Sequence, residues 1–264
     1  MKKVLFLVAL ALTVTACDKI ERKSFGDAIL TLVENQTKSL KGLECDGQVV
    51  LPTVYQDIVL GSFSSRVSLF IASRDGRQTL YRFAPRHGEN VLDSVYSAQK
   101  ITRIVMKDKD EAWIAEDANG KTVLHAWMPG WKTTGPWEEV YPGPMEYVVK
   151  KNDLYGLVIL PSTAELAPPM YEDVLVTRGI NGTCYCFKKK GENFYTVNHV
   201  TSKEYAPFKR RLAPLKVGKI SQAGMDELKS QARRSGQLIN EHVFSLDNVS
   251  KETYKKYQKD FGER

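Results

Sequence analysis

The sequence is poor in the residues and motifs that mark an enzyme or a metal site. Its 264 residues contain four histidines, His87, His125, His199 and His242, and no two of them stand at a metal-ligand spacing. There is no HExxH motif, no glycine-rich phosphate loop and no GxSxG elbow. The sequence therefore predicts no cofactor, no metal and no catalytic residue. An enzyme whose site is assembled from distant residues stays open as an alternative.

Charge of one sign is only modestly in excess. The formal net charge is +7, with 42% hydrophobic and 26% charged residues, which is typical of a globular protein. The basic residues are not concentrated enough to predict nucleic acid as a partner. A modest basic excess suits anionic lipid headgroups or an acidic partner protein.

Long apolar runs are also missing, apart from a short one at the N-terminus. Two lysines precede an apolar run over residues 4–12, which is too short to cross a bilayer. The run closes on Val14-Thr15-Ala16-Cys17, which resembles the lipobox of bacterial lipoproteins. The resemblance implies that residues 1–16 are a signal peptide and that Cys17 is lipidated and becomes the first residue. A plain secretory signal with an incidental cysteine is the alternative.

The resemblance also predicts where the protein works. Several acyl chains on one cysteine hold a protein stably at a membrane, so the mature chain is expected to face the periplasm from a lipid anchor. Asp18, directly after the anchor, resembles the inner-membrane retention signal of enteric-type sorting. Residues 17–23 are polar and are expected to form the lipidated cysteine and its tether.

Cysteine is scarce in the rest of the chain. Only Cys45, Cys184 and Cys186 remain after Cys17, in a compartment where disulfides persist. Cys184 and Cys186 flank Tyr185 in a predicted strand, so they point to one face and cannot easily bond each other. Either Cys45 forms a disulfide with one of them, or all three are buried thiols.

Helices are predicted at both ends. In residues 24–42, Ser24 and Asp27 make a capping-box-like start and apolar residues recur near helical spacing. This N-terminal helix is expected to pack on the core, with the membrane surface as the alternative. Residues 201–264 form a basic and mostly helical segment, with one helix over 221–235 and a last helix that Ser250 caps.

Residues 45–200 have the residue pattern of a β domain. The clearest hairpin turn is Arg74-Asp75-Gly76-Arg77, which needs positive φ. Further strand pairs surround Asn119-Gly120, Asn152-Asp153 and Asn181-Gly182, and another strand follows at 194–197. The chain is therefore predicted to be mainly β, a succession of antiparallel hairpins with flanking α-helices.

The hairpins recur with an apolar residue and a tyrosine ahead of each, as in Val54-Tyr55 and Met170-Tyr171, at intervals of roughly 30 to 45 residues. Residues 150–158, which contain Tyr155-Gly156, resemble one unit of the bacterial WG-repeat family together with Tyr171-Glu172-Asp173-Val174. In that family a lysine-rich turn leads to an aromatic-Gly pair, a short strand and a Tyr-acid-acid-aliphatic element. Tyr155 replaces the usual Trp, and the other units lack the aromatic-Gly pair. The resemblance implies a propeller-like or barrel-like binding scaffold without catalytic residues; an unrelated β-sandwich or barrel is the alternative.

Two segments are candidates for binding a partner. All four tryptophans lie in residues 113–137, and Trp127, Trp131 and Trp137 stand in a stretch that glycine and proline predict to be a loop. Loop tryptophans on a rigid β scaffold suit a binding hot spot, and packing in the core is the alternative. Lys209-Arg210-Arg211 is the second candidate, for lipid phosphates or an acidic partner surface, with a solvated turn as the alternative.

These observations predict a lipid-anchored extracytoplasmic protein that binds one protein partner and no nucleic acid. The most specific version is an immunity protein that neutralises a secreted antibacterial toxin at the membrane. The alternatives are a structural or assembly lipoprotein of the bacterial envelope, and an envelope hydrolase with an unrecognised site.

Overall fold

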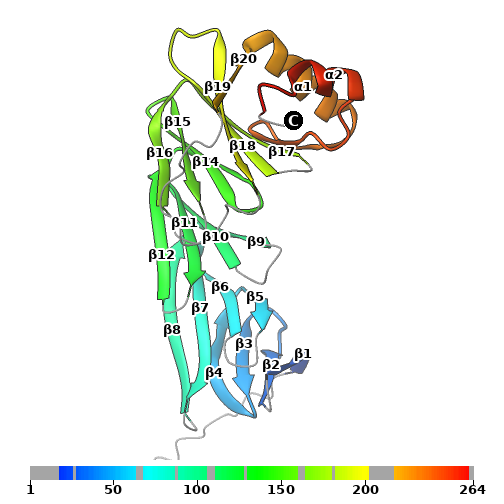
Figure 1. The fold of residues 1–264 in the computed structure, drawn as a ribbon. Helices are drawn as coiled ribbons and strands as arrows, with labels where there is room; N and C mark the ends of the chain where they lie inside the picture. The colour runs from blue at the N-terminus through cyan, green and yellow to red at the C-terminus, as the bar shows by residue number, and fades with distance from the viewer. Residues whose placement is uncertain are drawn as a thin grey trace, which may run out of the picture. The chain divides into compact units, whose positions relative to one another are not determined.

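The fold is known from a computed structural model, which describes residues 18–25, 28–63, 68–86, 89–105, 111–127, 130–159, 164–179, 182–201 and 217–261. The chain forms two compact units, Met1–Ala98 and Gln99–Arg264. In both, strands adjacent in sequence pair antiparallel, and the last sheet adds one parallel pair of strands that are not adjacent in sequence (Figure 1). The chain is therefore mainly β and consists of successive antiparallel hairpins, as the sequence predicts.

The first unit consists of two four-stranded meanders, in the orders β1-β2-β3-β4 and β5-β6-β7-β8. The predicted turn between β6 and β7 is present, with positive φ at Asp75 and Gly76. The strands are β1 (Asp18–Phe25), β2 (Ala28–Glu34), β3 (Lys41–Cys45), β4 (Gln48–Tyr55), β5 (Asp57–Phe63), β6 (Ser68–Arg74), β7 (Arg77–Arg86) and β8 (Glu89–Ala98). One hydrophobic cluster takes Leu30 and Leu43 from the first sheet and Phe70 from the second, so the two sheets share a core.

The N-terminal helix predicted over residues 24–42 is wrong, because β1, β2 and the start of β3 occupy this stretch. Ile29, Thr31 and Val33 are β-branched and pack well on a pleated surface. The chain then turns at Asn35, whose side-chain oxygen accepts hydrogen bonds from the Ser39 and Leu40 amides at 3.0 and 3.2 Å. The predicted tether is corrected as well, since residues 18–23 belong to β1.

The second unit contains three sheets, in the orders β12-β11-β10-β9, β13-β14-β15-β16 and β20-β19-β18-β17-β22-β21. The strands of the first two are β9 (Lys100–Val105), β10 (Glu111–Asp117), β11 (Gly120–Trp127), β12 (Gly130–Trp137), β13 (Glu139–Pro142), β14 (Glu146–Lys151), β15 (Leu154–Ile159) and β16 (Ala164–Tyr171). The third contains β17 (Asp173–Gly179), β18 (Gly182–Lys188), β19 (Phe194–Thr201), β20 (Val217–Ser221), β21 (Leu238–Asn240) and β22 (Val243–Ser245). The strands predicted around 119–120, 152–153 and 181–182 are all present.

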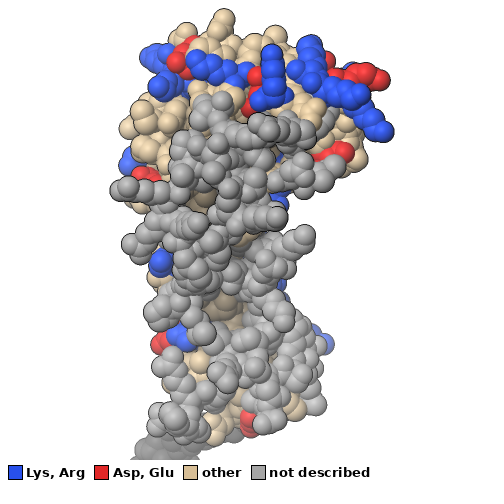
Figure 2. Space-filling model, in the orientation of Figure 1, with Lys and Arg blue, Asp and Glu red and all other residues tan. Residues whose placement is uncertain are grey.

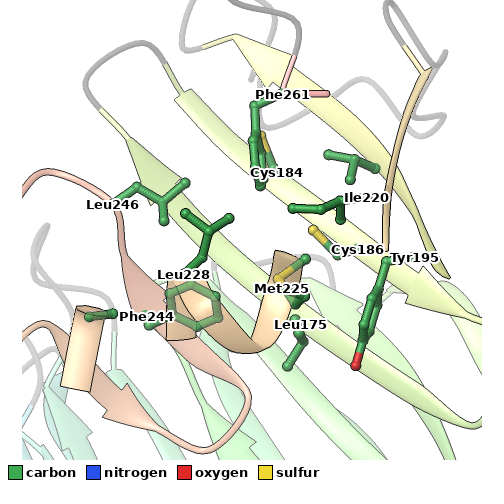
Figure 3. Close-up of a cluster of buried hydrophobic side chains, with 12 residues drawn as sticks. Leu175, Cys184, Cys186, Tyr195, Ile220, Met225, Leu228, Phe244, Leu246 and Phe261 are labelled. Carbon is green, nitrogen blue, oxygen red and sulfur yellow. The ribbon is translucent and has the colours of Figure 1, made fainter. Parts of the chain in front are cut away.

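The sheets of the second unit pack face to face through side chains that alternate along the strands. One cluster joins Trp137 and Val123 to Tyr147 of the next sheet, and another joins Val148 to Val176 and Tyr185 of the last. The far face of the last sheet is covered by helix α1 (Gln222–Arg234), whose Met225 and Leu228 enter its core, and by the segment around helix α2 (Lys251–Tyr257) (Figure 3). The two helices therefore cap the last sheet.

The two C-terminal helices confirm the predictions made for 221–235 and for the segment after Ser250. Ser221 and Ser250 are the N-caps, and their side-chain oxygens accept hydrogen bonds from the Gly224 and Thr253 amides. The segment 201–264 is nevertheless not a separate, mostly helical region. It also contributes β20, β21 and β22 to the sheet of β17–β19, and β22 pairs in parallel with β17.

Consecutive sheets are joined by single residues. These junction residues are Gln56, Gln99, Glu138 and Glu172. At Glu172, the amide donates to the carbonyl oxygen of Lys188 at 2.8 Å, and the carboxylate accepts from the Gly191 amide at 3.2 Å. Gln56 and Glu138 make the same two kinds of bond to the hairpins that follow them. Hydrogen bonds, rather than a flexible linker, therefore hold each of these three junctions to the next hairpin.

Candidate functional site

Several predicted site residues lie outside the described residues. These are Cys17 and Lys209-Arg210-Arg211, and the side chain of Trp127 is likewise not described. No helix in the described part of the chain is long and apolar enough to cross a membrane. Within the same ranges, no three or more His, Cys, Asp or Glu side chains are grouped to hold a metal ion.

The tryptophan-rich stretch is a hairpin and not the predicted loop. Trp127 ends β11 and pairs with Gly130 at the start of β12, and Trp131 and Trp137 lie within β12. Trp137 is 5% exposed in the core between two sheets, which corrects its assignment to a partner-binding surface. Trp131 is half-buried, and it is the one of the three whose described side chain reaches solvent.

The three cysteines are buried thiols in the structure. Cys184 and Cys186 enter the core beneath α1 while Tyr185 points into the opposite core, so the two thiols lie on one face as predicted. Cys45 lies in the core of the first unit. Burial raises the pKa of the Cys45 thiol, and it raises that of Cys186 well above its ordinary value. Of the two sequence alternatives, the structure has the buried thiols.

The second unit brings a histidine and an aspartate together from distant parts of the chain. His242 lies between β21 and β22, and its Nδ1 is 3.2 Å from Oδ1 of Asp173 at the start of β17. The same nitrogen is 2.9 Å from the carbonyl oxygen of Val174. Tyr195 donates its hydroxyl to Asp173 Oδ2 at 2.6 Å. Because Nδ1 faces two acceptors, it carries the hydrogen when the ring is neutral.

Two tyrosine rings enclose the imidazole from the neighbouring sheet. The ring centroids of Tyr141 and Tyr155 lie 4.3 and 4.6 Å from that of His242, which is 8% exposed. Tyr141 donates its hydroxyl to Glu139, which also accepts from the Lys150 ammonium at 3.0 Å. These two hydrogen bonds lower the pKa of Glu139.

The electrostatics of the pair favour an ionised aspartate. Burial alone would raise the pKa of Asp173, but the contact with His242 and the hydrogen bond from Tyr195 outweigh it, so the pKa of Asp173 is lowered. Burial raises the pKa of Tyr195 far above its ordinary value, and the adjacent Asp173 carboxylate adds to the shift. The pair at neutral pH is therefore an Asp173 carboxylate that accepts a hydrogen bond from Tyr195 and lies 3.2 Å from His242 Nδ1.

An aspartate that orients a histidine is one half of many nucleophilic sites. The contacts recorded for His242, however, are with a carboxylate, a carbonyl oxygen and two rings. These contacts hold the hairpin β21–β22 against β17 and against the sheet of β13 and β15. The side-chain amide of Asn240 adds a hydrogen bond to the Pro142 carbonyl oxygen at 2.8 Å. We call Asp173 and His242 the clamp, because their contacts hold the β21–β22 hairpin to the neighbouring strands. The sequence showed Tyr155 and Asp173 in the WG-like stretch, but a lone histidine so far along the chain carried no signal.

Lysine and arginine gather over the end of the second unit that carries α1 and α2 (Figure 2). Several of the acidic groups there are engaged: Glu227 pairs with Lys256 at 3.0 Å, and Glu241 pairs with Lys229 at 3.1 Å. Lys251, Lys255 and Lys259 are exposed, and no described acidic side chain forms an ion pair with them. Glu252 is also exposed beside them and Asp260 interacts electrostatically with Lys259, so residues 251–260 carry four lysines against two acidic residues and keep an excess of positive charge.

No protein-family model matches the sequence, and no curated protein matches it. The structure is similar to the WD40 domain of SCAP from fission yeast, with a TM-score of 0.28 and 10% identity over 70% of this chain and 68% of that one. It is also similar to TolB from Acinetobacter baumannii, with a TM-score of 0.31 and 12% identity over 64% of this chain and 48% of that one. Likeness at this level gives no basis for assigning a function.

Proposed function

We propose that this chain is a lipid-anchored protein of the bacterial envelope that faces the periplasm and binds another protein. The anchor is supported by Val14-Thr15-Ala16-Cys17 at the end of a short apolar run. The first described strand begins at Asp18, the residue after Cys17, so the folded part would begin directly at the membrane surface. Asp18 also supports retention at the inner membrane in a cell with enteric-type sorting.

The observation that carries the binding role is the way the sheets are joined. Gln56, Glu138 and Glu172 each replace a linker with a single residue that is hydrogen-bonded to the next hairpin. A surface preorganised in this way loses little conformational freedom on binding, which is what a protein-binding scaffold needs. Gly156, the glycine of the aromatic-Gly pair, supports the resemblance to WG repeats. A side-chain carbon at this position would meet the backbone of β16 at 2.7 Å, so the position requires glycine.

The anchor is tested by feeding cells an alkyne-bearing fatty acid and comparing the wild-type chain with Cys17→Ser. We expect label and membrane association in the wild type, and neither in Cys17→Ser. A wild-type chain that stays unlabelled and is released from the membrane by high salt would refute the anchor.

The binding role is tested by capture from envelope extracts with residues 18–264, which contain every described residue. We expect one stoichiometric partner, with weaker capture by Trp131→Ala. Val49→Ala is the matched control, because Val49 is an apolar residue of β4 that is 67% exposed. Absence of a stoichiometric partner for the folded wild-type chain would overturn the binding role.

In its most specific form, the proposal makes the partner a secreted antibacterial toxin. The captured protein would then stop growth when it is directed to the periplasm, and co-expression of this chain would restore growth. A partner that is harmless and resident in the envelope would instead establish the structural or assembly role.

A further inference from the structure

We propose that Lys251, Lys255 and Lys259, here called the lysine stripe, bind the anionic headgroups of a membrane surface. The three lysines are exposed and spaced four residues apart, so they share one side of a helix. Helix α2 ends at Tyr257, but the Phe261 amide still donates to the Tyr257 carbonyl oxygen at 3.3 Å. The helical turn therefore continues through Lys259.

The other side of this segment is occupied by the protein's own core. Phe261 is 2% exposed and belongs to the cluster beneath α1, and Thr253 is buried. Tyr257 packs so closely on α1 that a side-chain carbon at Gly224 would meet its ring at 2.7 Å. With its apolar side covered, the segment cannot insert into a bilayer as an amphipathic helix does. Contact with a membrane would be electrostatic, through the ammonium groups.

The chemistry of the stripe favours lipid over protein. Lysine is a compact and strongly hydrated charge that is depleted in protein interfaces, where arginine is enriched. Headgroup phosphates attract lysines that keep their hydration, at a separation limited by the Debye length. Glu227 and Glu241 do not cancel the stripe, because they are already paired with other cations. Glu252 and Asp260 on the same segment offset part of its charge, but with Lys256 the segment has four lysines against these two acidic residues.

This inference rests on the proposed membrane location but not on lipidation itself. An anchor elsewhere in the chain would raise the effective concentration of headgroups at the stripe, so a weak contact would suffice. The stripe can therefore be tested on a chain without its anchor. A failure of the proposed anchor and a failure of the proposed lysine stripe can therefore be told apart, because each is measured in its own experiment.

The test is co-sedimentation of residues 18–264 with phosphatidylcholine vesicles, with and without phosphatidylglycerol, at low salt. We expect binding only with phosphatidylglycerol, and a decrease as salt is added. The partition coefficient should fall roughly a hundredfold in the triple variant that combines Lys251→Gln, Lys255→Gln and Lys259→Gln. This is the loss expected when three lysines each contribute the amount typical of one lysine near an anionic surface.

The matched control combines Lys100→Gln, Lys132→Gln and Lys151→Gln. These lysines are exposed in the same unit, so the control has the same net charge as the stripe variant. It should bind nearly as well as the wild type. Equal losses in the two variants would show that only total charge matters and would overturn the proposal. Absence of binding to phosphatidylglycerol, with binding to an acidic polypeptide at the same salt, would overturn it in favour of an acidic protein partner.

Discussion

Replacing Asp173 by asparagine tests the clamp at His242 with little change of shape. Asparagine keeps an oxygen that can accept from Tyr195, but it removes the negative charge that faces His242. A hydrogen bond to a charged group contributes about 1.5–3 kcal/mol and a neutral one about 1 kcal/mol. Asp173→Asn turns the Tyr195 bond into a neutral one and removes the charge 3.2 Å from His242 Nδ1, so we expect the hairpin β21–β22 to lose about 1–3 kcal/mol of local stability.

Hydrogen exchange read by mass spectrometry measures this loss directly. Peptides that cover β21 and β22 should exchange faster in Asp173→Asn, while peptides in β10 and β11 should not change. Asp153→Asn is the control, because the Asp153 side chain is 96% exposed in the turn between β14 and β15 and asparagine tolerates the positive φ there. It should leave exchange in β21 and β22 as in the wild type. Unchanged exchange in β22 of Asp173→Asn at neutral pH would refute the clamp.

The same variant tests how the stability that the clamp contributes depends on pH. The folded-state pKa of Asp173 is lower than its unfolded value, so its stabilising contribution is present above about pH 4 and is lost as the pH falls through the folded value. Wild-type stability in the β21–β22 hairpin should therefore fall on acidification below about pH 4. Asp173→Asn should lack this part of the decline.

Four substitutions test the packing, each by urea unfolding followed with circular dichroism. Trp137→Ala should cost about 3–5 kcal/mol because it empties a core site, and Trp131→Ala should cost clearly less; equal costs would contradict the burial of Trp137. Gly156→Ala should cost about 1–3 kcal/mol, since its new carbon would meet backbone atoms of β16 that cannot move aside. Gly224→Ala should cost less than Gly156→Ala, because its new carbon meets side-chain atoms of Tyr257 and Ile220 rather than backbone and because alanine favours the helix; the reverse order would contradict this reasoning.

The strands joined by tight turns were predictable from the sequence because their turn chemistry is local. Asp75-Gly76 and Asn152-Asp153 adopt the positive φ that their residue types permit, and the flanking strands followed from that. The prediction of an N-terminal helix was wrong for a different reason. The apolar residues around Leu30 and Leu32 fit both a helical and a strand period, and only pairing with β1 and β3 decides between them.

The surface and the clamp depended on contacts that the sequence does not display. Trp137 resembled a loop residue because Gly135 and Pro136 precede it, yet pairing with Lys121 places it in a strand and turns its ring into the core. His242 gained its partners only when β22 joined the sheet beside β17, a parallel pairing with no local signal.

That parallel pairing makes the chain vulnerable at its far end. The inner strand β17, with Val176 and Thr177 fully buried, has no partner on one edge until Val243 and Phe244 have been synthesised. A nonsense mutation or a proteolytic cut in the last few dozen residues would leave a bare, apolar edge that other chains can extend. Truncated copies would therefore aggregate rather than persist as shortened but soluble proteins.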